Sequence, residues 1–140
     1  MDFTRGLNAE QTQAVLAGDG PVLVLAGPGS GKTRVLTHRV AHLVENEGVY
    51  PYRILAVTFT NKAAREMVSR LERLIGPTTN DLTVGTFHAI CAGILRREAE
   101  HLGISRNYVI YDADDQRRLV TRILKQLNVD SKQFAPNAMQ

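Results

Sequence analysis

Apolar residues along this chain follow two patterns, short continuous runs and stripes spaced three or four residues apart. A continuous run is typical of a strand buried on both faces, whereas a spaced stripe is typical of a helix with one face on the core. The runs predict strands at residues 22–26, 54–59 and 82–86, with 108–111 as a further candidate. The stripes predict helices at residues 7–16, 31–46, 61–75, 87–101 and 112–127. Asn8 can cap the first of these helices, and Gln11 stands where the reciprocal capping side chain would be.

The predicted helices differ in how clearly a core-facing side is marked. The helix at 61–75 is strongly amphipathic, and Gly76-Pro77 ends it. Its inward side chains are expected to be Met67, Val68, Leu71, Leu74 and Ile75. In the helix at 31–46, the side chains expected to face the core are Leu36, Val40, Leu43 and Val44. In the helix at 87–101, they are Phe87, Ile90, Cys91, Ile94 and Leu95.

Strands and helices alternate along the chain, and this order predicts an α/β fold in which helices flank a parallel sheet. In such folds ligands bind beyond the carboxyl ends of the strands. We therefore expect the segments that follow 22–26, 54–59 and 82–86 to carry the function.

Composition adds few constraints. The 140 residues suffice for one domain with a core, and a net charge of +3 permits an anionic partner without requiring one. Cys91 is the single cysteine, so neither an internal disulfide nor a disulfide-linked partner is expected. The sequence has no signal peptide and no run of membrane-spanning length, which predicts a soluble intracellular protein.

The stretch VLVLAGPGSGKTR resembles a phosphate-binding loop between a strand and a helix. Gly27, Gly29 and Gly31 allow tight turns that bring backbone amides to a polyanion, and the following helix directs its positive end there. Lys32 supplies a mobile charge for the outer phosphates. Thr33 places a hydroxyl where Mg²⁺ would bridge the phosphates.

Ala26 stands where the strict pattern has glycine. A methyl group is tolerated there if the backbone φ is negative. Phosphate binding alone does not identify the reaction, because small-molecule kinases, transport ATPases, GTPases and helicases all use such loops.

VTFTNKAAREM follows the second predicted strand. Thr60, Asn61 and Lys62 at a helix start suit a sugar–phosphate backbone, and an exposed Phe59 would offer a stacking surface for a base. An equally simple interpretation makes Thr60 a helix cap, Phe59 part of the core and Lys62 a solvated charge. The residues by themselves leave both interpretations open.

VGTFHAI follows the third predicted strand. Phe87 falls on the apolar stripe and is expected in the core, whereas His88 points away from that stripe. With Thr86, His88 could donate hydrogen bonds to a phosphate at the helix start. The alternative is a surface histidine without a role in binding.

Taken in order and at these separations, LNAEQTQAV, AGPGSGKT, VTFTNKAAREM and GTFHAI resemble the N-terminal motor region of superfamily 1 DNA helicases of the UvrD/Rep/PcrA type. The resemblance covers nearly the whole chain. It implies a P-loop NTPase (RecA-like) fold, here incomplete, over residues 1–110. YVIYDADDQRRLV is similar to the start of an inserted helical subdomain, expected at residues 111–140.

The resemblance also implies roles for individual residues. Gln11 would read the adenine edge, and Arg34 would pack its guanidinium on the adenine face. The phosphates would be held by Ala26, Gly27, Pro28, Gly29, Ser30, Gly31, Lys32 and Thr33, with Lys32 and Thr33 closest to catalysis. Single-stranded DNA would be contacted by Phe59, Thr60, Asn61, Thr86 and His88.

The implied function is that of an ATP-dependent DNA helicase with ATP and Mg²⁺ as cofactors. Its partners would be single-stranded DNA and DNA junctions, and it would move along DNA from 3′ to 5′. It would act in the bacterial cytosol, in DNA repair or replication. The family also needs an acidic pair after a later strand, and the acids at Asp112, Asp114 and Asp115 are better explained as a helix cap. We therefore expect the N-terminal part of a longer helicase, able to bind nucleotide but not to unwind DNA.

Two other classes remain as alternatives. The sequence GPGSGKT also resembles loops of nucleotide kinases, although TFTNKAAREM provides neither an arginine-bearing lid nor an acceptor site. A module that binds nucleotide or nucleic acid without catalysis is the second alternative.

Overall fold

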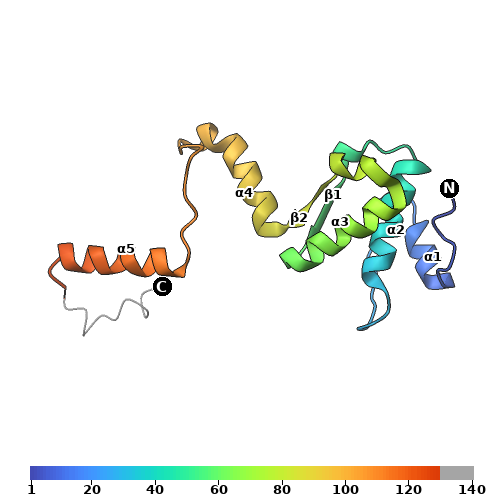
Figure 1. The fold of residues 1–140 in the computed structure, drawn as a ribbon, viewed down its shortest axis with the longest axis horizontal. Helices are drawn as coiled ribbons and strands as arrows, with labels where there is room; N and C mark the ends of the chain where they lie inside the picture. The colour runs from blue at the N-terminus through green and yellow to red at the C-terminus, as the bar shows by residue number, and fades with distance from the viewer. Residues whose placement is uncertain (130–140) are drawn as a thin grey trace. The chain divides into compact units, whose positions relative to one another are not determined.

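The structure, a computed structural model, describes residues 1–129. Contacts divide the chain into two compact units, Met1–Leu95 and Arg96–Gln140. The elements of the chain, labelled in Figure 1, are α1 (Ala9–Val15), α2 (Lys32–Glu45), η1 (Pro51–Arg53), β1 (Leu55–Thr58), α3 (Asn61–Ile75), η2 (Gly76–Asp81), β2 (Thr83–Thr86), α4 (Phe87–Glu98), η3 (Ala99–Leu102) and α5 (Ala113–Gln126). The end of the expected helical subdomain, 130–140, lies outside the described residues.

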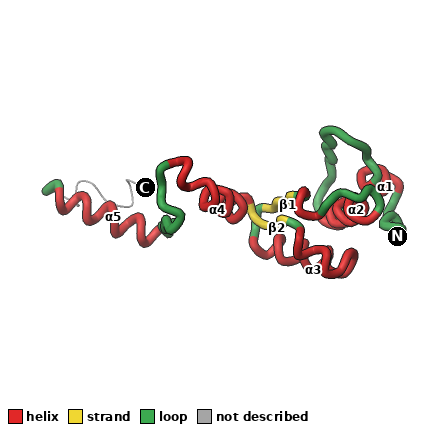
Figure 2. Tube along the Cα trace, turned by 90° about the horizontal axis from the view of Figure 1, so that it is seen from above, coloured by secondary structure: helices red, strands yellow, loops and turns green. Residues whose placement is uncertain are grey.

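The two strands of the first unit pair in parallel, with Leu55 opposite Thr83 and Thr58 opposite Thr86. Parallel neighbours require a crossover connection, and α3 provides it. An α/β fold with a parallel sheet is thus confirmed, with two strands in the part of the chain that the structure describes (Figure 2).

The core of the first unit forms on the apolar face of α3. Met67, Leu71 and Ile75 recur at four-residue spacing and are buried, Leu71 completely. This face meets Phe3 from the N-terminal segment, Val40 and Ala41 of α2, Ala56 of β1, and Leu82 before β2. Val68 and Leu74 are half-buried beside it, so the expected α3 face is confirmed.

Hydrogen bonds fasten the N-terminal segment and α1 to α2. Asn8 and Gln11 form the reciprocal capping pair expected at the start of α1. The Arg39 guanidinium donates to the carbonyl oxygens of Ala14, Val15 and Ala17, the last at 2.7 Å. These bonds satisfy carbonyls that the end of α1 would leave unpaired, and they hold α1 against α2.

The predicted strand at 22–26 is wrong. This segment has no strand pairing and lies within the long loop between α1 and α2 (Figure 2). Leu23 and Leu25 are 83% and 87% exposed. The apolar run indicated a buried strand, but strand structure depends on a neighbour for its hydrogen bonds, and the described ladder joins β1 to β2 only.

The predicted strand at 108–111 and the predicted buried face of α4 are also wrong. Residues 108–111 form no strand, and no residue of α4 is buried. Phe87, Ile94 and Leu95, expected inward, are 51%, 43% and 41% exposed. An apolar stripe marks which face of a helix can be buried, but an opposing element must cover it.

The stripe expected on α2 is partly wrong. Val40 is buried as expected, but Leu36 is 40% exposed and Val35 is buried instead. Because α2 contacts both α1 and α3, its buried face is broader than the predicted stripe.

The second unit is described here by itself. Asp112 caps α5, with its side chain accepting from the Asp115 amide at 2.8 Å, so the acids at this helix start act as the predicted cap. Leu124 is buried, whereas Leu119 and Ile123 on the same helix are about two-fifths exposed (38% and 42%). The Arg96 guanidinium lies 5.4 Å from the centre of the Tyr108 ring.

We predict that Leu71→Ala lowers the free energy of unfolding by about 2–5 kcal/mol, because it opens a cavity at the centre of the core. Leu23→Ala, which truncates the same side chain at an 83% exposed position, should change it by less than about 0.5 kcal/mol. Urea unfolding of both variants checks the pair, and equal losses would contradict the assignment of the core.

Candidate functional site

The glycine-rich loop leads directly into α2. Gly29 and Gly31 have φ values of 75° and 84°, a region that residues with a Cβ seldom occupy. The Ser30 hydroxyl donates to the Gly27 carbonyl oxygen at 2.8 Å and closes the turn. Asn128 is the one non-glycine residue with positive φ among residues 1–129, so Ala26 has the negative φ that its methyl group requires.

Lys32, the first residue of α2, folds back on the loop. Its ammonium donates to the carbonyl oxygens of Gly27 at 2.7 Å and Ala26 at 3.1 Å. The charge is therefore held over the start of the loop by neutral acceptors. An ammonium binds anionic oxygens more strongly than neutral carbonyls, so this arrangement suits exchange for a phosphate.

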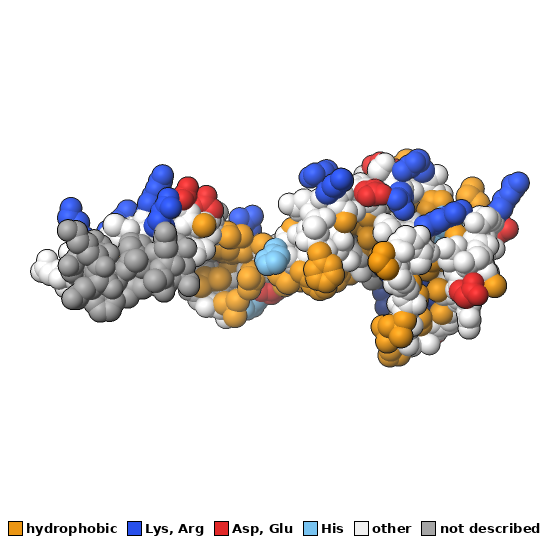
Figure 3. Space-filling model, turned by 90° about the horizontal axis from the view of Figure 1, so that it is seen from below, with side chains coloured by type: hydrophobic (Ala, Val, Ile, Leu, Met, Phe, Trp, Pro, Cys, Tyr) orange, Lys and Arg blue, Asp and Glu red, His pale blue; other side chains and the backbone are white. Residues whose placement is uncertain are grey.

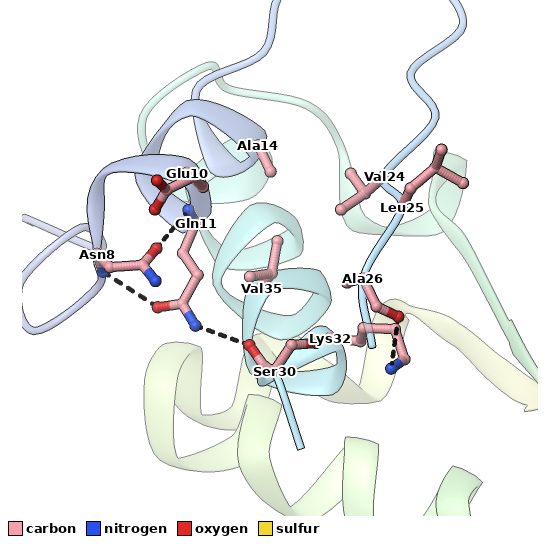
Figure 4. A pocket seen from close by; sticks show the side chains of 10 residues that line it. All are labelled: Asn8, Glu10, Gln11, Ala14, Val24, Leu25, Ala26, Ser30, Lys32 and Val35. Carbon is pink, nitrogen blue, oxygen red and sulfur yellow. Dashed lines mark hydrogen bonds between the residues drawn. The ribbon is translucent and has the colours of Figure 1, made fainter. Parts of the chain in front are cut away.

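Gln11 connects α1 to the loop. Its side-chain carbonyl accepts from the Asn8 amide at 3.1 Å, and its side-chain nitrogen donates to the Ser30 carbonyl at 2.9 Å (Figure 4). A Cβ built on Gly31 would lie 2.9 Å from that nitrogen. Glycine is therefore favoured at position 31 by its positive φ, and a side chain there would displace the end of the Gln11 side chain.

A pocket of about 280 Å³ lies between α1, residues 24–26 of the loop and the start of α2. Its lining, drawn in Figure 4, comprises Asn8, Glu10, Gln11, Ala14, Val24, Leu25, Ala26, Ser30, Lys32 and Val35. Five of these residues are apolar, and the five polar ones come from the start of α1 (Asn8, Glu10, Gln11) and from the end of the loop and the start of α2 (Ser30, Lys32). Small-molecule sites commonly combine apolar walls with a few polar groups. The structure therefore brings Gln11, Ala26, Ser30 and Lys32 together around one cavity.

Other residues expected at this site lie beside the pocket. Thr33 follows Lys32 in the first turn of α2 and is half-buried. Arg34 is exposed, and the pocket lining does not include it. Pro28 and Gly29 are exposed on the loop.

A second group of residues follows the carboxyl ends of the two paired strands. Phe59 comes directly after β1 and Phe87 directly after β2. Because Thr58 is opposite Thr86, the two rings are neighbours, with centroids 5.7 Å apart and planes tilted by 46°. Phe59 is 88% exposed, so its interpretation as a core residue is wrong.

The polar residues around these rings occupy different positions. Thr60 caps α3 by accepting from the Ala63 amide at 3.1 Å, and Asn61 is exposed in the first turn. Thr86 is buried and accepts from the Ala89 amide at 3.2 Å. His88 is exposed at the start of α4.

The sequence placed Phe87 in the core, but its ring is 51% exposed beside that of Phe59. The informative signal was its position, since Phe87 follows β2 as Phe59 follows β1. Sequence reasoning also missed the bond from Gln11 to Ser30, for which the sequence holds no signal. No helix of residues 1–129 is long and apolar enough to cross a membrane.

Comparison with a protein family and comparison with individual relatives point to the same group of proteins. The family described as "UvrD/REP helicase N-terminal domain" matches residues 7–140. The chain is 51% identical over 134 residues to the ATP-dependent DNA helicase PcrA of Staphylococcus epidermidis, covering 96% of this chain and 18% of that protein. It is 51% identical over 130 residues to the PcrA helicase of Staphylococcus aureus, covering 93% and 18%. The chain thus spans about a fifth of the length of these relatives.

We predict that Gly31→Ala lowers the free energy of unfolding by about 1–2 kcal/mol, because alanine resists positive φ. It should also break the bond from Gln11 to Ser30, which a shifted side-chain amide signal of Gln11 in NMR spectra would report. Gly27→Ala is the matched control, since an added Cβ there meets nothing within 4 Å and φ is not positive. Equal effects of both variants would count against the geometry of the loop.

Proposed function

The chain belongs to the UvrD/REP helicase family, and on that premise we propose that it is the ATP-binding and single-stranded-DNA-contacting part of an ATP-dependent DNA helicase. In this proposal the first unit forms part of a RecA-like P-loop domain. Residues 111–140 begin an inserted helical subdomain. The observation that carries the proposal is the combination of a glycine-rich loop ending in Lys32 and Thr33 with an exposed aromatic residue, Phe59, after a parallel strand.

The residues of the glycine-rich loop suit a nucleoside triphosphate. Gly29 and Gly31 have the positive φ that a tight loop needs to present its amides, and α2 begins directly behind them. Lys32 would exchange its contacts with the Ala26 and Gly27 carbonyls for phosphate oxygens. Thr33 would offer its hydroxyl to Mg²⁺, which neutralises phosphate charge when bound.

Base recognition is proposed for Gln11 and Arg34. The Gln11 amide both accepts and donates, which matches the adenine edge, and in this structure it already spans from Asn8 to Ser30. To contact a base, Gln11 would give up the bond to Ser30 while remaining a helix cap. Exposed Arg34 would place its guanidinium on the face of the base.

Contact with DNA is proposed at the carboxyl ends of β1 and β2. The 88% exposed ring of Phe59 offers a face for a base, and a base stacks on any aromatic face irrespective of sequence. Thr60 and Asn61 lie at the start of α3, and His88 lies at the start of α4. Free backbone amides at helix starts favour phosphates. Thr86 is the last residue of β2. DNA junctions are proposed as further partners, with 3′ to 5′ movement in the whole protein.

The chain by itself is proposed to bind ATP without unwinding DNA. Movement along a DNA strand needs two domains that bind the strand in alternation. In related nucleotide hydrolases, arginines from another domain or protein stabilise the charge on the transferring phosphoryl group. These arginines raise the rate of hydrolysis by about a thousandfold or more. The residues that follow β1 and β2 are Phe59-Thr60 and Phe87-His88, so neither strand end carries an acidic pair.

We predict that Lys32→Ala weakens binding of magnesium–ATP by about 10- to 100-fold, the value of a charged hydrogen bond to phosphate. Lys125→Ala removes an equal charge from an exposed position on α5 and should leave the affinity unchanged. Isothermal titration calorimetry measures both. Equal affinities of the wild-type chain and Lys32→Ala would reject the loop as the nucleotide site.

We predict that Phe59→Ala weakens binding of single-stranded DNA by about 1–3 kcal/mol, the value of one stacked base. Its free energy of unfolding should fall by no more than about 1.5 kcal/mol, because the ring is 88% exposed and its contact with the Phe87 ring is worth at most about that much. Tyr52→Ala removes an aromatic ring that is 70% exposed on η1, outside the proposed contact, and serves as control in fluorescence anisotropy. Similar losses of DNA affinity in both variants would contradict the proposed role of Phe59.

A further inference from the structure

The half-buried side chain of Arg39 on α2 bonds to the end of α1. One of its terminal nitrogens, Nη1, donates to the carbonyl oxygens of Ala14 and Val15, each at 3.2 Å, and of Ala17 at 2.7 Å. These acceptors are neutral carbonyls in the last turn of α1 and directly after it. A charged donor on such carbonyls makes a stronger bond than a neutral donor would.

The short helix α1 has few other means of holding its C-terminal end. It has seven residues, a length at which a helix is only marginally stable without tertiary contacts. Its own last turn contains no basic residue, although a positive charge there would offset the negative end of the helix. Arg39 supplies that charge from α2, and Val15 at the same end is fully buried. The end of α1 is thereby fixed against α2, beside which it lies in Figures 1 and 2.

The start of α1 carries Gln11, one helical turn before Val15. The Gln11 side chain donates to the Ser30 carbonyl oxygen at 2.9 Å, and its backbone amide donates to the Asn8 side chain at 2.8 Å. A shift or rotation of α1 on α2 would therefore move Gln11 relative to the glycine-rich loop. Lys32 is different, because it is the first residue of α2 and moves with that helix.

We propose that Arg39 is a positioning residue for base selection, which acts by holding α1 at the place on α2 from which Gln11 reaches the base. The inference rests on the proposed function, in which Gln11 reads the adenine edge and the loop holds the phosphates. Arg39 contacts neither the base nor the phosphates. It fixes the separation between the helix that reads the base and the helix start that binds the phosphates. A glutamine amide selects adenine only when its donor and its acceptor are both aligned with the base.

This role is separable from a contribution to the core. Among residues 1–129, the buried cluster around Leu71 contains no residue of α1. A looser α1 would therefore leave the packing of α2 on α3 in place, together with Lys32 at the start of α2. Base selection should change while phosphate binding does not.

The first test measures the affinities of magnesium–ATP, magnesium–GTP and inorganic tripolyphosphate by isothermal titration calorimetry. Arg39→Met keeps an unbranched side chain and removes every donor. The ratio of ATP affinity to GTP affinity should fall by about fivefold or more, the discrimination expected of one aligned amide pair. The affinity for tripolyphosphate, which has no base, should stay at the wild-type value. An unchanged ratio, or an equal weakening of all three ligands, would overturn the inference.

Two controls separate this effect from lost stability and from lost charge. Ile75→Val removes a methyl group from a core position of α3 that is 8% exposed, so it lowers stability without touching α1. Arg53→Gln removes an equal charge from an exposed position on η1. Both should keep the wild-type ratio, and a comparable fall in either would count against Arg39. Arg39→Gln, with a shorter side chain, replaces Arg39→Met if melting curves show that the latter does not fold.

The second test asks whether Arg39 acts through Gln11. Arg39→Met should lower the ATP to GTP ratio in the wild-type chain but not in Gln11→Ala, whose side chain no longer reads the base. A further fall of the same size in the Gln11→Ala background would show that Arg39 acts by another route, and would overturn the inference.

The third test needs no nucleotide. In NMR spectra of the chain alone, the side-chain amide signals of Gln11 should shift in Arg39→Met, because its bond to Ser30 is weakened, and should stay in place in Ile75→Val. Unshifted Gln11 signals in Arg39→Met would overturn the positioning role. Failure of the proposed function itself would appear in the wild-type chain, as equal affinities for ATP and GTP or as no binding of either. That result would overturn the role in base selection together with the proposed function, whatever the Gln11 signals show.

Discussion

The burial of one face of α3 is the interaction on which the rest of the first unit depends. Leu71 lies at its centre, between α2 and the strands, and α3 is also the connection that makes β1 and β2 parallel neighbours. Because the pairing brings both strand ends to one edge, it sets Phe59 beside Phe87. One hydrophobic contact therefore positions the strand ends at which contact with DNA is proposed.

The glycine-rich loop is organised by hydrogen bonds and backbone conformation, with little help from packing. Gln11 joins it to α1, and Lys32 closes on the carbonyls at its start. Polar groups at an exposed site exchange partners at small net free energy, because water and ligand atoms replace the bonds that are broken. A loop held in this way can rearrange around an anion, while α2 behind it stays fixed by the core.

Exposed apolar side chains are concentrated in a few parts of the described chain. Apolar side chains are exposed in the segment around Leu23 and Leu25, along α4, and at Leu119 and Ile123 of α5. Figure 3 shows exposed apolar atoms in orange on one face of the molecule. Surface of this kind is normally covered by further structure or by a partner. The matched stretch makes up 18% of the length of the relatives in Staphylococcus.

The sequence by itself determined the elements whose signals are local. It predicted α3 with its buried face, the caps at Asn8 and Asp112, and the family through four short motifs, because periodicity, capping and motif spacing are properties of neighbouring residues. Tertiary structure alone decided what depends on distant partners. It left 22–26 unpaired and α4 uncovered, since a strand needs another strand and an apolar face needs an opposing one. It also decided that Phe59 is exposed and that Arg39 of α2 reaches the carbonyls at the end of α1, because such proximity arises only when the chain packs.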